Sequence, residues 1–344
     1  MPNISELVTA GEVARVWNEK AQERKPYLGE ALFPAKKQLG LRMKSIKGGA
    51  QPIRILNLAA FDTKAIPLDR EGFETIAEKM PFFKNTLNVD EELRQQLNQV
   101  AEDNTGVINA IVDEIMDDQT TLLNNADATR EYMRMKALTT GAINFSNNGV
   151  TVAVDYNIPA DNKVTLDTGK WSDAENADPI SDINDLISKI TVAGYDAPNA
   201  ILMNSVTFGL MRKTEALKNA IYVFGNGKVV PNANAAKEYI QGETGCTIYV
   251  YDKGMNINGT FEKFVPDNCV VVFNAQNVGK TTFGTTPEES DLTAGLTAKV
   301  AIVDTGVAIT QYTENDPVVS TTKVSMICLP SLEGANSIGI ITVA

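Results

Sequence analysis

The run Gly279-Lys280-Thr281 has the ending of a phosphate-binding loop, a motif whose backbone N–H groups converge on one anion. Such a loop also needs a first glycine, with four residues between it and Gly279. That position is 274, and here it is Asn274. We therefore predict no phosphate site. The same residues are typical of a turn that follows a strand, which we expect over 269–274.

Two groups of carboxylates have the residue types of a metal site or of a general acid–base pair. The first group flanks apolar positions of a predicted helix, as a solvated helix face does, and comprises Asp113, Glu114, Asp117 and Asp118. The second group lies in a stretch rich in Thr, Pro and Gly that we predict to be a mobile loop, and comprises Glu288, Glu289 and Asp291. Acid–base catalysis needs a carboxylate held in a dry pocket, so we predict no catalytic residue, no metal site and no cofactor.

The chain contains no histidine, which removes the Ser-His-Asp triad, the Cys-His pair and His-ligated zinc from consideration. Its three cysteines, Cys246, Cys269 and Cys328, are far apart and fit neither a disulfide framework nor a metal-binding pair. Cys269 and Cys328 lie within apolar runs, where a free thiol packs as a small apolar side chain. We expect both in the core and the protein in a reducing compartment.

The 344 residues carry 43 acidic and 31 basic side chains, a formal net charge of −12. This excess disfavours specific binding to a phosphate backbone, which needs clustered Lys and Arg. No signal peptide and no membrane-spanning run is evident. The length allows about two domains, and the apolar fraction of 43% suffices for a sizeable core.

The elements that must position these residues begin with an amphipathic helix in the first thirty residues. It is either a surface helix packed on its own core, which the sequence favours, or an arm that reaches a neighbouring subunit. From about Asp90 to Gly141 apolar residues recur at helical spacing, which predicts one long helix ending at Gly141.

Residues 39–85 have a different sequence pattern. Short segments in which apolar and polar residues alternate are separated by Gly and Pro, and this pattern predicts a long β-hairpin. This segment has a local basic surplus: Arg42, Lys44, Lys47, Arg54, Lys64, Arg70, Lys79 and Lys84. It has few of the apolar blocks that a self-contained domain needs. It is therefore either a hairpin that needs a partner or a solvated ribbon on the parent domain.

The remainder alternates helices and strands, which indicates an α+β class. We predict a hairpin strand after the Asn148-Gly149 turn and a strand over 200–203, with helices over 180–193, after Asn204 or Ser205, and over 215–220. A helix over 232–241, strands over 246–251, 269–274 and 298–312, and a final β region from Pro317 follow.

Several stretches resemble the major capsid proteins of tailed bacteriophages, and most of all the lambda-like major capsid protein E family. They are Ala65-Ile-Pro-Leu-Asp-Arg-Glu-Gly72, Met80-Pro81-Phe82-Phe83, Tyr132-Met-Arg-Met-Lys-Ala-Leu138, and Asp316-Pro317 leading to Leu329-Pro330-Ser331. The resemblance covers nearly the whole chain in the order of its elements. It implies the HK97-like capsid fold, which bacterial encapsulins share.

The resemblance implies an N-terminal arm over 1–38, an extended hairpin called the E-loop over 39–85, a peripheral domain with a long spine helix over 86–228 and 313–344, and an axial domain over 229–312. The hairpin would lie over an adjacent subunit. Its expected intersubunit contacts are Arg42, Lys44, Lys47, Arg54, Lys64 and Arg70. Some members of the wider group crosslink a loop lysine to an asparagine of another subunit. Lys44, Lys47 and Lys64 are candidate donors by location only, and whether a crosslink forms stays open.

The function that the resemblance implies is that of a major capsid protein, without enzyme activity, which assembles into the hexamers and pentamers of an icosahedral shell around phage double-stranded DNA. Its expected partners are further copies of itself, a separate scaffolding protein and the portal; whether a decoration protein binds stays open. The DNA would be enclosed without sequence-specific binding. We expect assembly in the host bacterial cytoplasm and a final location in the virion.

Two alternatives remain at this point. One is an encapsulin-type shell protein of a cellular compartment, which has the same fold. The other is a carboxylate-dependent enzyme with an acidic pocket around 286–291.

Overall fold

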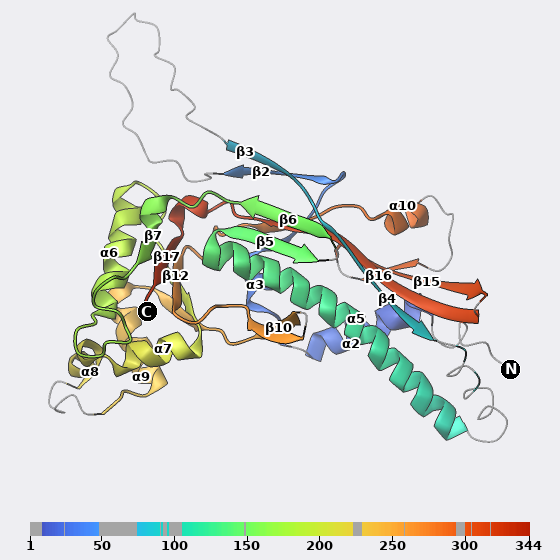
Figure 1. The fold of residues 1–344 in the computed structure, drawn as a ribbon, viewed down its shortest axis with the longest axis horizontal. Helices are drawn as coiled ribbons and strands as arrows, with labels where there is room; N and C mark the ends of the chain where they lie inside the picture. The colour runs from blue at the N-terminus through green and yellow to red at the C-terminus, as the bar shows by residue number, and fades with distance from the viewer. Residues whose placement is uncertain are drawn as a thin grey trace, which may run out of the picture. The chain divides into compact units, whose positions relative to one another are not determined.

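The computed structural model describes residues 9–23, 25–47, 74–89, 91, 95, 105–147, 149–222, 229–257, 259–293, 300–303, 305–316 and 318–344 (Figure 1). The chain divides into two compact units. Unit 1 comprises Met1–Met43, Glu78–Glu131 and Thr281–Pro330, and unit 2 comprises Lys44–Ala77, Tyr132–Lys280 and Ser331–Ala344.

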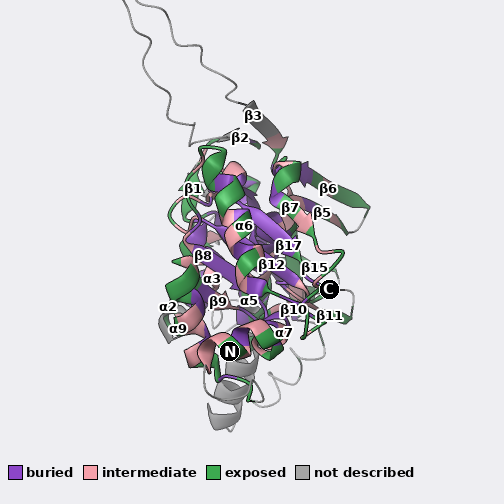
Figure 2. Cartoon of the chain, turned by 90° about the vertical axis from the view of Figure 1, so that its left-hand side faces the viewer, coloured by how far each residue is buried: buried purple, intermediate pink, exposed green. Residues whose placement is uncertain are grey.

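Unit 2 is built on a five-stranded mixed sheet in the order β7-β17-β12-β8-β9. The strands are β7 (Lys163–Thr165), β8 (Ala200–Met203), β9 (Thr247–Val250), β12 (Cys269–Phe273) and β17 (Gly339–Thr342). Every residue of β8 and β12 is buried, as expected for central strands covered on both faces (Figure 2). The predicted strands over 200–203, 246–251 and 269–274 and the β pattern at the end of the chain are thus confirmed.

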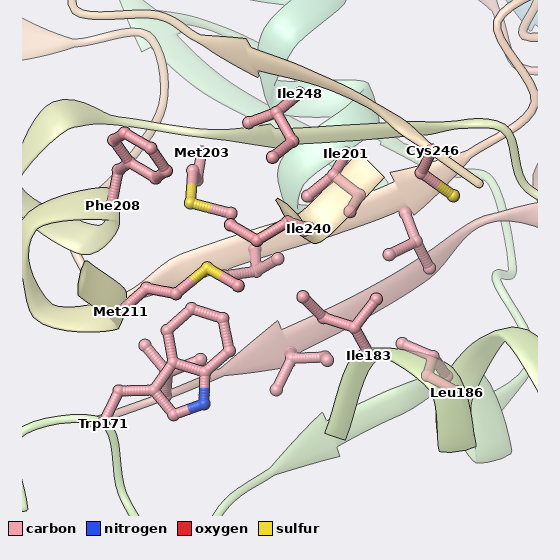
Figure 3. Close-up of a cluster of buried hydrophobic side chains, with 14 of the residues drawn as sticks. Trp171, Ile183, Leu186, Ile201, Met203, Phe208, Met211, Ile240, Cys246 and Ile248 are labelled. Carbon is pink, nitrogen blue, oxygen red and sulfur yellow. The ribbon is translucent and has the colours of Figure 1, made fainter. Parts of the chain in front are cut away.

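Four helices supply apolar side chains to this sheet: α6 (Pro179–Val192), α7 (Ser205–Lys213), α8 (Glu215–Ile221) and α9 (Ala233–Thr244). Ile183 and Leu186 of α6 pack with Ile201 of β8 and Ile240 of α9 in one cluster (Figure 3). Gly339 lets β17 approach α6 closely, because a Cβ there would lie 2.6 Å from Leu186 Cδ2. All four helices were predicted within a few residues of their observed bounds.

The boundaries of these helices follow from capping residues. Asp178 accepts a hydrogen bond from the backbone N–H of Ser181, and Pro179 opens α6. Asn204 caps α7 as predicted, and Asn232 caps α9.

The long helix α5 (Thr105–Thr140) has 36 residues, about 54 Å at 1.5 Å per residue. It ends at Gly141 (φ +74°), as predicted. The hairpin β5 (Ala142–Asn147) and β6 (Val150–Asp155) follows, with its turn at Gly149. Within the predicted range from Asp90, only residues 91 and 95 are described before Thr105, and both are helical.

Unit 1 is built on a sheet in the order β1-β13-β16-β15-β14, with β4 also paired to β16. Its strands are β1 (Ala35–Lys37), β4 (Phe82–Val89), β13 (Lys280–Phe283), β14 (Val300–Val303), β15 (Val307–Asn315) and β16 (Val318–Ser331). Buried charges of α5 join other parts of the unit: Glu131 Oε1 accepts a hydrogen bond from the N–H of Gly29 at 2.9 Å, and Arg130 lies 5.8 Å from the ring centre of Phe283.

The N-terminal helix α2 (Ala10–Glu23) packs against β14 and β15 of its own unit. Val13 and Trp17 are 1% and 3% exposed. This confirms, for its described residues, the interpretation as a surface helix on its own core. A short helix, α3 (Leu28–Leu32), follows it.

Two sequence predictions about this unit are wrong. The single strand expected over 298–312 is the hairpin β14–β15, because Gly306 (φ +77°) turns the chain where a Cβ would lie 2.7 Å from Phe283. The stretch 286–291, expected to be a mobile loop, contains helix α10 (Pro287–Thr293), which the ion pairs described below hold in place.

The two units do not coincide with the expected domains. The boundary expected at 228/229 lies within unit 2, and the one at 312/313 lies within β15. Strand pairing joins residues far apart in the chain, and a linear pattern does not show which strands pair. The division into arm, E-loop, peripheral and axial domains therefore remains a prediction.

All three cysteines are free and buried, as expected for Cys269 and Cys328. Burial raises the pKa of the Cys269 thiol to about 12. In the described part of the chain, no helix has the length and apolar character needed to cross a bilayer.

Candidate assembly surface

The two ends of the predicted hairpin, residues 39–43 and 78–85, belong to unit 1, and its sheet holds the chain on both sides of them. Before the hairpin, β1 pairs in parallel with β13, and the N–H of Gln38 donates to the Phe283 carbonyl at 2.9 Å. The strands β2 (Arg42–Lys47) and β3 (Glu74–Lys79) then pair as a separate two-stranded ribbon (Figure 1). After β3, strand β4 pairs with β16 from Phe82↔Ile327 to Val89↔Ser320. The segment between β2 and β3, residues 48–73, lies outside the described residues.

The packing at this attachment leaves little space. A Cβ added to Gly284 would lie 2.8 Å from Ile327 Cγ2, 3.0 Å from Met80 Cε and 3.1 Å from the carbonyl oxygen of Gly40. The N–H of Met80 donates to the Leu41 carbonyl at 2.8 Å, which closes the base of the ribbon. The base of the hairpin is thus held in one position by the sheet of unit 1.

Three large apolar side chains remain exposed at this base: Leu39 (91%), Leu41 (50%) and Phe82 (43%). Lys84 lies 5.9 Å from the ring centre of Phe82. Of the exposed basic residues of the same segments, Lys37 pairs with Glu289, and the other four are Lys36, Arg42, Lys79 and Lys84. We call the three apolar and these four basic side chains the root surface; aromatic side chains and Arg, here Phe82 and Arg42, are enriched in protein–protein contacts.

Of the six predicted contact residues, Arg42 is exposed on β2 and belongs to the root surface. Lys44 and Lys47 lie on β2, but their side chains are outside the described residues, as are Arg54, Lys64 and Arg70 altogether. Their role stays a prediction. Leu39 and Leu41 fit the alternation of the predicted strand, which does not show that both are exposed; the one signal in the sequence is Gly40 (φ +94°) between them, which interrupts the strand.

Of the three carboxylates of the 286–291 stretch, two are held in ion pairs, and Asp291 is exposed. Glu288 Oε1 lies 2.7 Å from Lys323 Nζ, and Glu288 Oε2 accepts a hydrogen bond from Ser325 Oγ at 2.9 Å. Burial alone would raise the pKa of Glu288, but the hydrogen bonds from Lys323 and Ser325 outweigh it, so the pKa lies below its ordinary range. Glu289 pairs with Lys37 of β1 at 2.5 Å. These contacts hold α10 on the sheet.

The remaining candidates for chemistry are placed as follows. Lys280 and Thr281 begin strand β13 instead of forming the expected turn, and Lys280 Nζ lies 3.2 Å from Glu333, so Lys280 takes part in an ion pair. Among the acids of the long helix, Asp117 is exposed, and the side chains of Asp113, Glu114 and Asp118 lie outside the described residues. Within the described residues, no group of three metal-ligating side chains could hold an ion.

A long helix, a hairpin rooted in one sheet, and a second mixed sheet with helices packed on it define the HK97-like capsid fold. Two solved structures have this fold over their whole length. A prophage protein of Escherichia coli CFT073 that is assigned as a capsid protein has a TM-score of 0.65 and 16% identity, covering 98% of this chain and 99% of that one. A phage-related protein of Bordetella bronchiseptica RB50 has a TM-score of 0.58 and 15% identity, with 98% of each chain covered.

The capsid subunit of cyanophage A-1(L) is also similar, with a TM-score of 0.50, 12% identity, and 92% and 91% of the two chains covered. No curated protein sequence is significantly similar. The profile of the phage major capsid protein E family matches residues 9–343, and the chain belongs to this family. It is a phage or prophage major capsid protein, a structural protein whose copies associate into the shell of the virion.

Proposed function

We propose that this chain assembles into the hexamers and pentamers of an icosahedral head that encloses double-stranded DNA, and that the hairpin 39–85 contributes the principal contact with the adjacent subunit. Family membership over residues 9–343 supports the general role. The root surface supports the proposed contact, because the sheet holds exposed apolar side chains in place beside exposed basic ones. A contact preorganised in this way loses less conformational entropy on association.

The proposal retains the arm over 1–38, a peripheral domain over 86–228 and 313–344, and an axial domain over 229–312. The contact residues of the hairpin are Arg42, Lys44, Lys47, Arg54, Lys64 and Arg70. The chain has no catalytic role in this proposal. A separate scaffolding protein and the portal act in assembly, which takes place in the host cytoplasm.

The net charge of −12 suits a shell around DNA, because a negative inner wall does not trap the packaged phosphate backbone. The DNA is therefore enclosed without sequence-specific binding.

The test is to purify the full chain, alone and with its scaffolding protein, and to measure its mass by light scattering and its form by negative-stain electron microscopy. We expect rings of five or six copies, sheets, tubes or closed shells. A compact monomer at all concentrations, also with the scaffolding protein present, would refute the proposal.

A charge-reversed hairpin tests the contact itself. With Arg54, Lys64 and Arg70 replaced by Glu, assembly should fall while the circular dichroism spectrum stays unchanged. The matched control replaces Lys189, Lys213 and Lys218, which lie on α6 to α8, by Glu. Equal assembly of the two variants would contradict a role of the hairpin.

A further inference from the structure

The edge of the unit 2 sheet carries a concentration of acidic side chains. Between residues 161 and 185 the sequence has seven acids and two lysines. Six of the acids are exposed, and we call them the acidic edge: Asp161, Asp167, Asp173, Glu175, Asp178 and Asp185. They flank the edge strand β7 and continue through the following segment into α6 (Figure 1).

The backbone that carries the acidic edge is held firmly. β7 pairs with β17, and beyond it the N–H of Leu166 donates to the Thr342 carbonyl at 3.0 Å and that of Trp171 to the Val343 carbonyl at 2.8 Å. The buried Trp171 indole donates from Nε1 to Asp182 Oδ2 at 2.9 Å, which ties this segment to α6. The acidic edge is therefore a fixed surface.

Most of these carboxylates have no counter-charge within the described residues. Asp173 and Asp178 accept local hydrogen bonds from Asn176 and Ser181. Asp161, Asp167, Glu175 and Asp185 form no hydrogen bond and no ion pair with any described side chain. With seven acids and two lysines the segment keeps a net negative charge, which an external positive charge would neutralise.

The root surface has the opposite composition. The described segments that form it, residues 35–47 and 74–89, hold seven basic and two acidic side chains. Within the described residues, Arg42, Lys79 and Lys84 form no ion pair, and Lys84 lies over the ring of Phe82. Two copies that each carry a net charge of −12 repel each other, so close contact favours places where the local charges are opposite.

We propose that the root surface of one copy docks on the acidic edge of a second copy of this chain. This inference rests on the proposed self-assembly and identifies the surface of the neighbour that the hairpin base meets. Every copy carries both surfaces, so the contact is head-to-tail, and a series of such contacts forms a ring where the rotation between copies closes. Leu39, Leu41 and Phe82 supply the apolar part of the contact, and the opposite charges fix its register.

Reversal of charge on each side separately, and then on both, tests the pairing. Arg42→Glu/Lys84→Glu reverses the root surface, and Asp161→Lys/Asp167→Lys reverses the acidic edge. Each variant alone should lower the assembled fraction by about tenfold or more, because like charges then face each other. The chain with all four substitutions should assemble nearly as the unaltered protein does. Light scattering and electron microscopy measure assembly, and circular dichroism checks the fold.

A mixture of the two reversed variants gives a second measurement that does not need the fourfold variant to fold. The reversed root of one variant then faces the reversed edge of the other, and the unaltered surfaces also match. The mixture should therefore form oligomers that neither variant forms alone. Matched controls change the same charges elsewhere: Lys213→Glu/Lys218→Glu on α7 and α8, and Glu238→Lys/Glu243→Lys on α9.

Three results would overturn the inference: reversed variants that assemble like their controls, a fourfold variant that folds without assembling, or a mixture that stays unassociated. Failure of the unaltered chain to assemble would instead count against the proposed function. The two failures are thus distinguishable.

Discussion

The Glu288 carboxylate joins helix α10 to strand β16 through Lys323 and Ser325. Glu288→Gln keeps the shape of the side chain and removes its charge. At pH 7 we expect the free energy of unfolding to fall by about 1–3 kcal/mol, because Lys323 loses its counter-charge in a site where Glu288 is only 8% exposed. Urea unfolding of the unassembled protein measures this loss.

The loss of stability caused by Glu288→Gln should depend on pH. The folded-state pKa of Glu288 lies below the ordinary value of 4.5, so the ion pair stabilises the fold fully above pH 4.5. This stabilisation is lost as the pH falls through the folded-state pKa, and the difference between the two proteins should then disappear. Glu243→Gln, at an exposed position of α9, is the control and should change stability little at either pH. A difference that persists in acid would contradict the ion-pair explanation.

At the scale of elements, the caps of α7 and α9 differ only in their surroundings. Asn204 is fully buried; its Oδ1 accepts from the N–H and the hydroxyl of Thr207 at 2.8 Å, and its Nδ2 donates to the Val265 carbonyl at 3.2 Å. Asn232 caps α9 at an exposed position. Asn232→Ala should cost about 1 kcal/mol, and Asn204→Ala about 2–4 kcal/mol, because it also leaves buried groups without partners.

Thermal unfolding of the two variants measures this comparison. Equal losses would show that the cap alone matters and that the contact of Asn204 with the 265 segment adds nothing.

The turn between β14 and β15 offers a second comparison of this kind. Gly306→Ala combines a positive φ with a Cβ 2.7 Å from Phe283, whereas Gly259→Ala places its Cβ in open space at a similar φ of +85°. We expect losses of about 2–4 kcal/mol for the first and about 1 kcal/mol for the second, since only the first adds a packing conflict. Chemical unfolding measures both, and a loss at Gly306 no larger than at Gly259 would contradict the close approach to Phe283.

At the scale of the whole molecule, the charge distribution makes assembly depend on ionic strength. The distance over which charges act falls from about 10 Å at 0.1 M salt to about 3 Å at 1 M. The assembly defect of Arg42→Glu/Lys84→Glu should therefore shrink as salt is raised, because repulsion across the contact is screened. Light scattering over this range of salt measures the effect. A defect of constant size would mean that the root surface acts by shape and not by charge.

The sequence by itself determined the local elements of this protein. Ile183, Leu186 and Ile190 recur at helical spacing and predicted α6, and Gly141 correctly marked the end of α5. These features depend on periodicity and on backbone conformation, which nearby residues decide. Resemblance, not periodicity, supplied the family and the expectation of a shell protein.

Only the tertiary structure decided which strands pair, that residues 300–315 form a hairpin, and that Glu288 meets Lys323. Each depends on contacts between residues far apart in the chain, and a linear pattern carries no distance between such residues. The exposure of Leu39 and Leu41 also depends on tertiary packing. Met43, two positions further on, continues the same alternation, yet it is fully buried, and only the packing of the sheet distinguishes it from the two leucines.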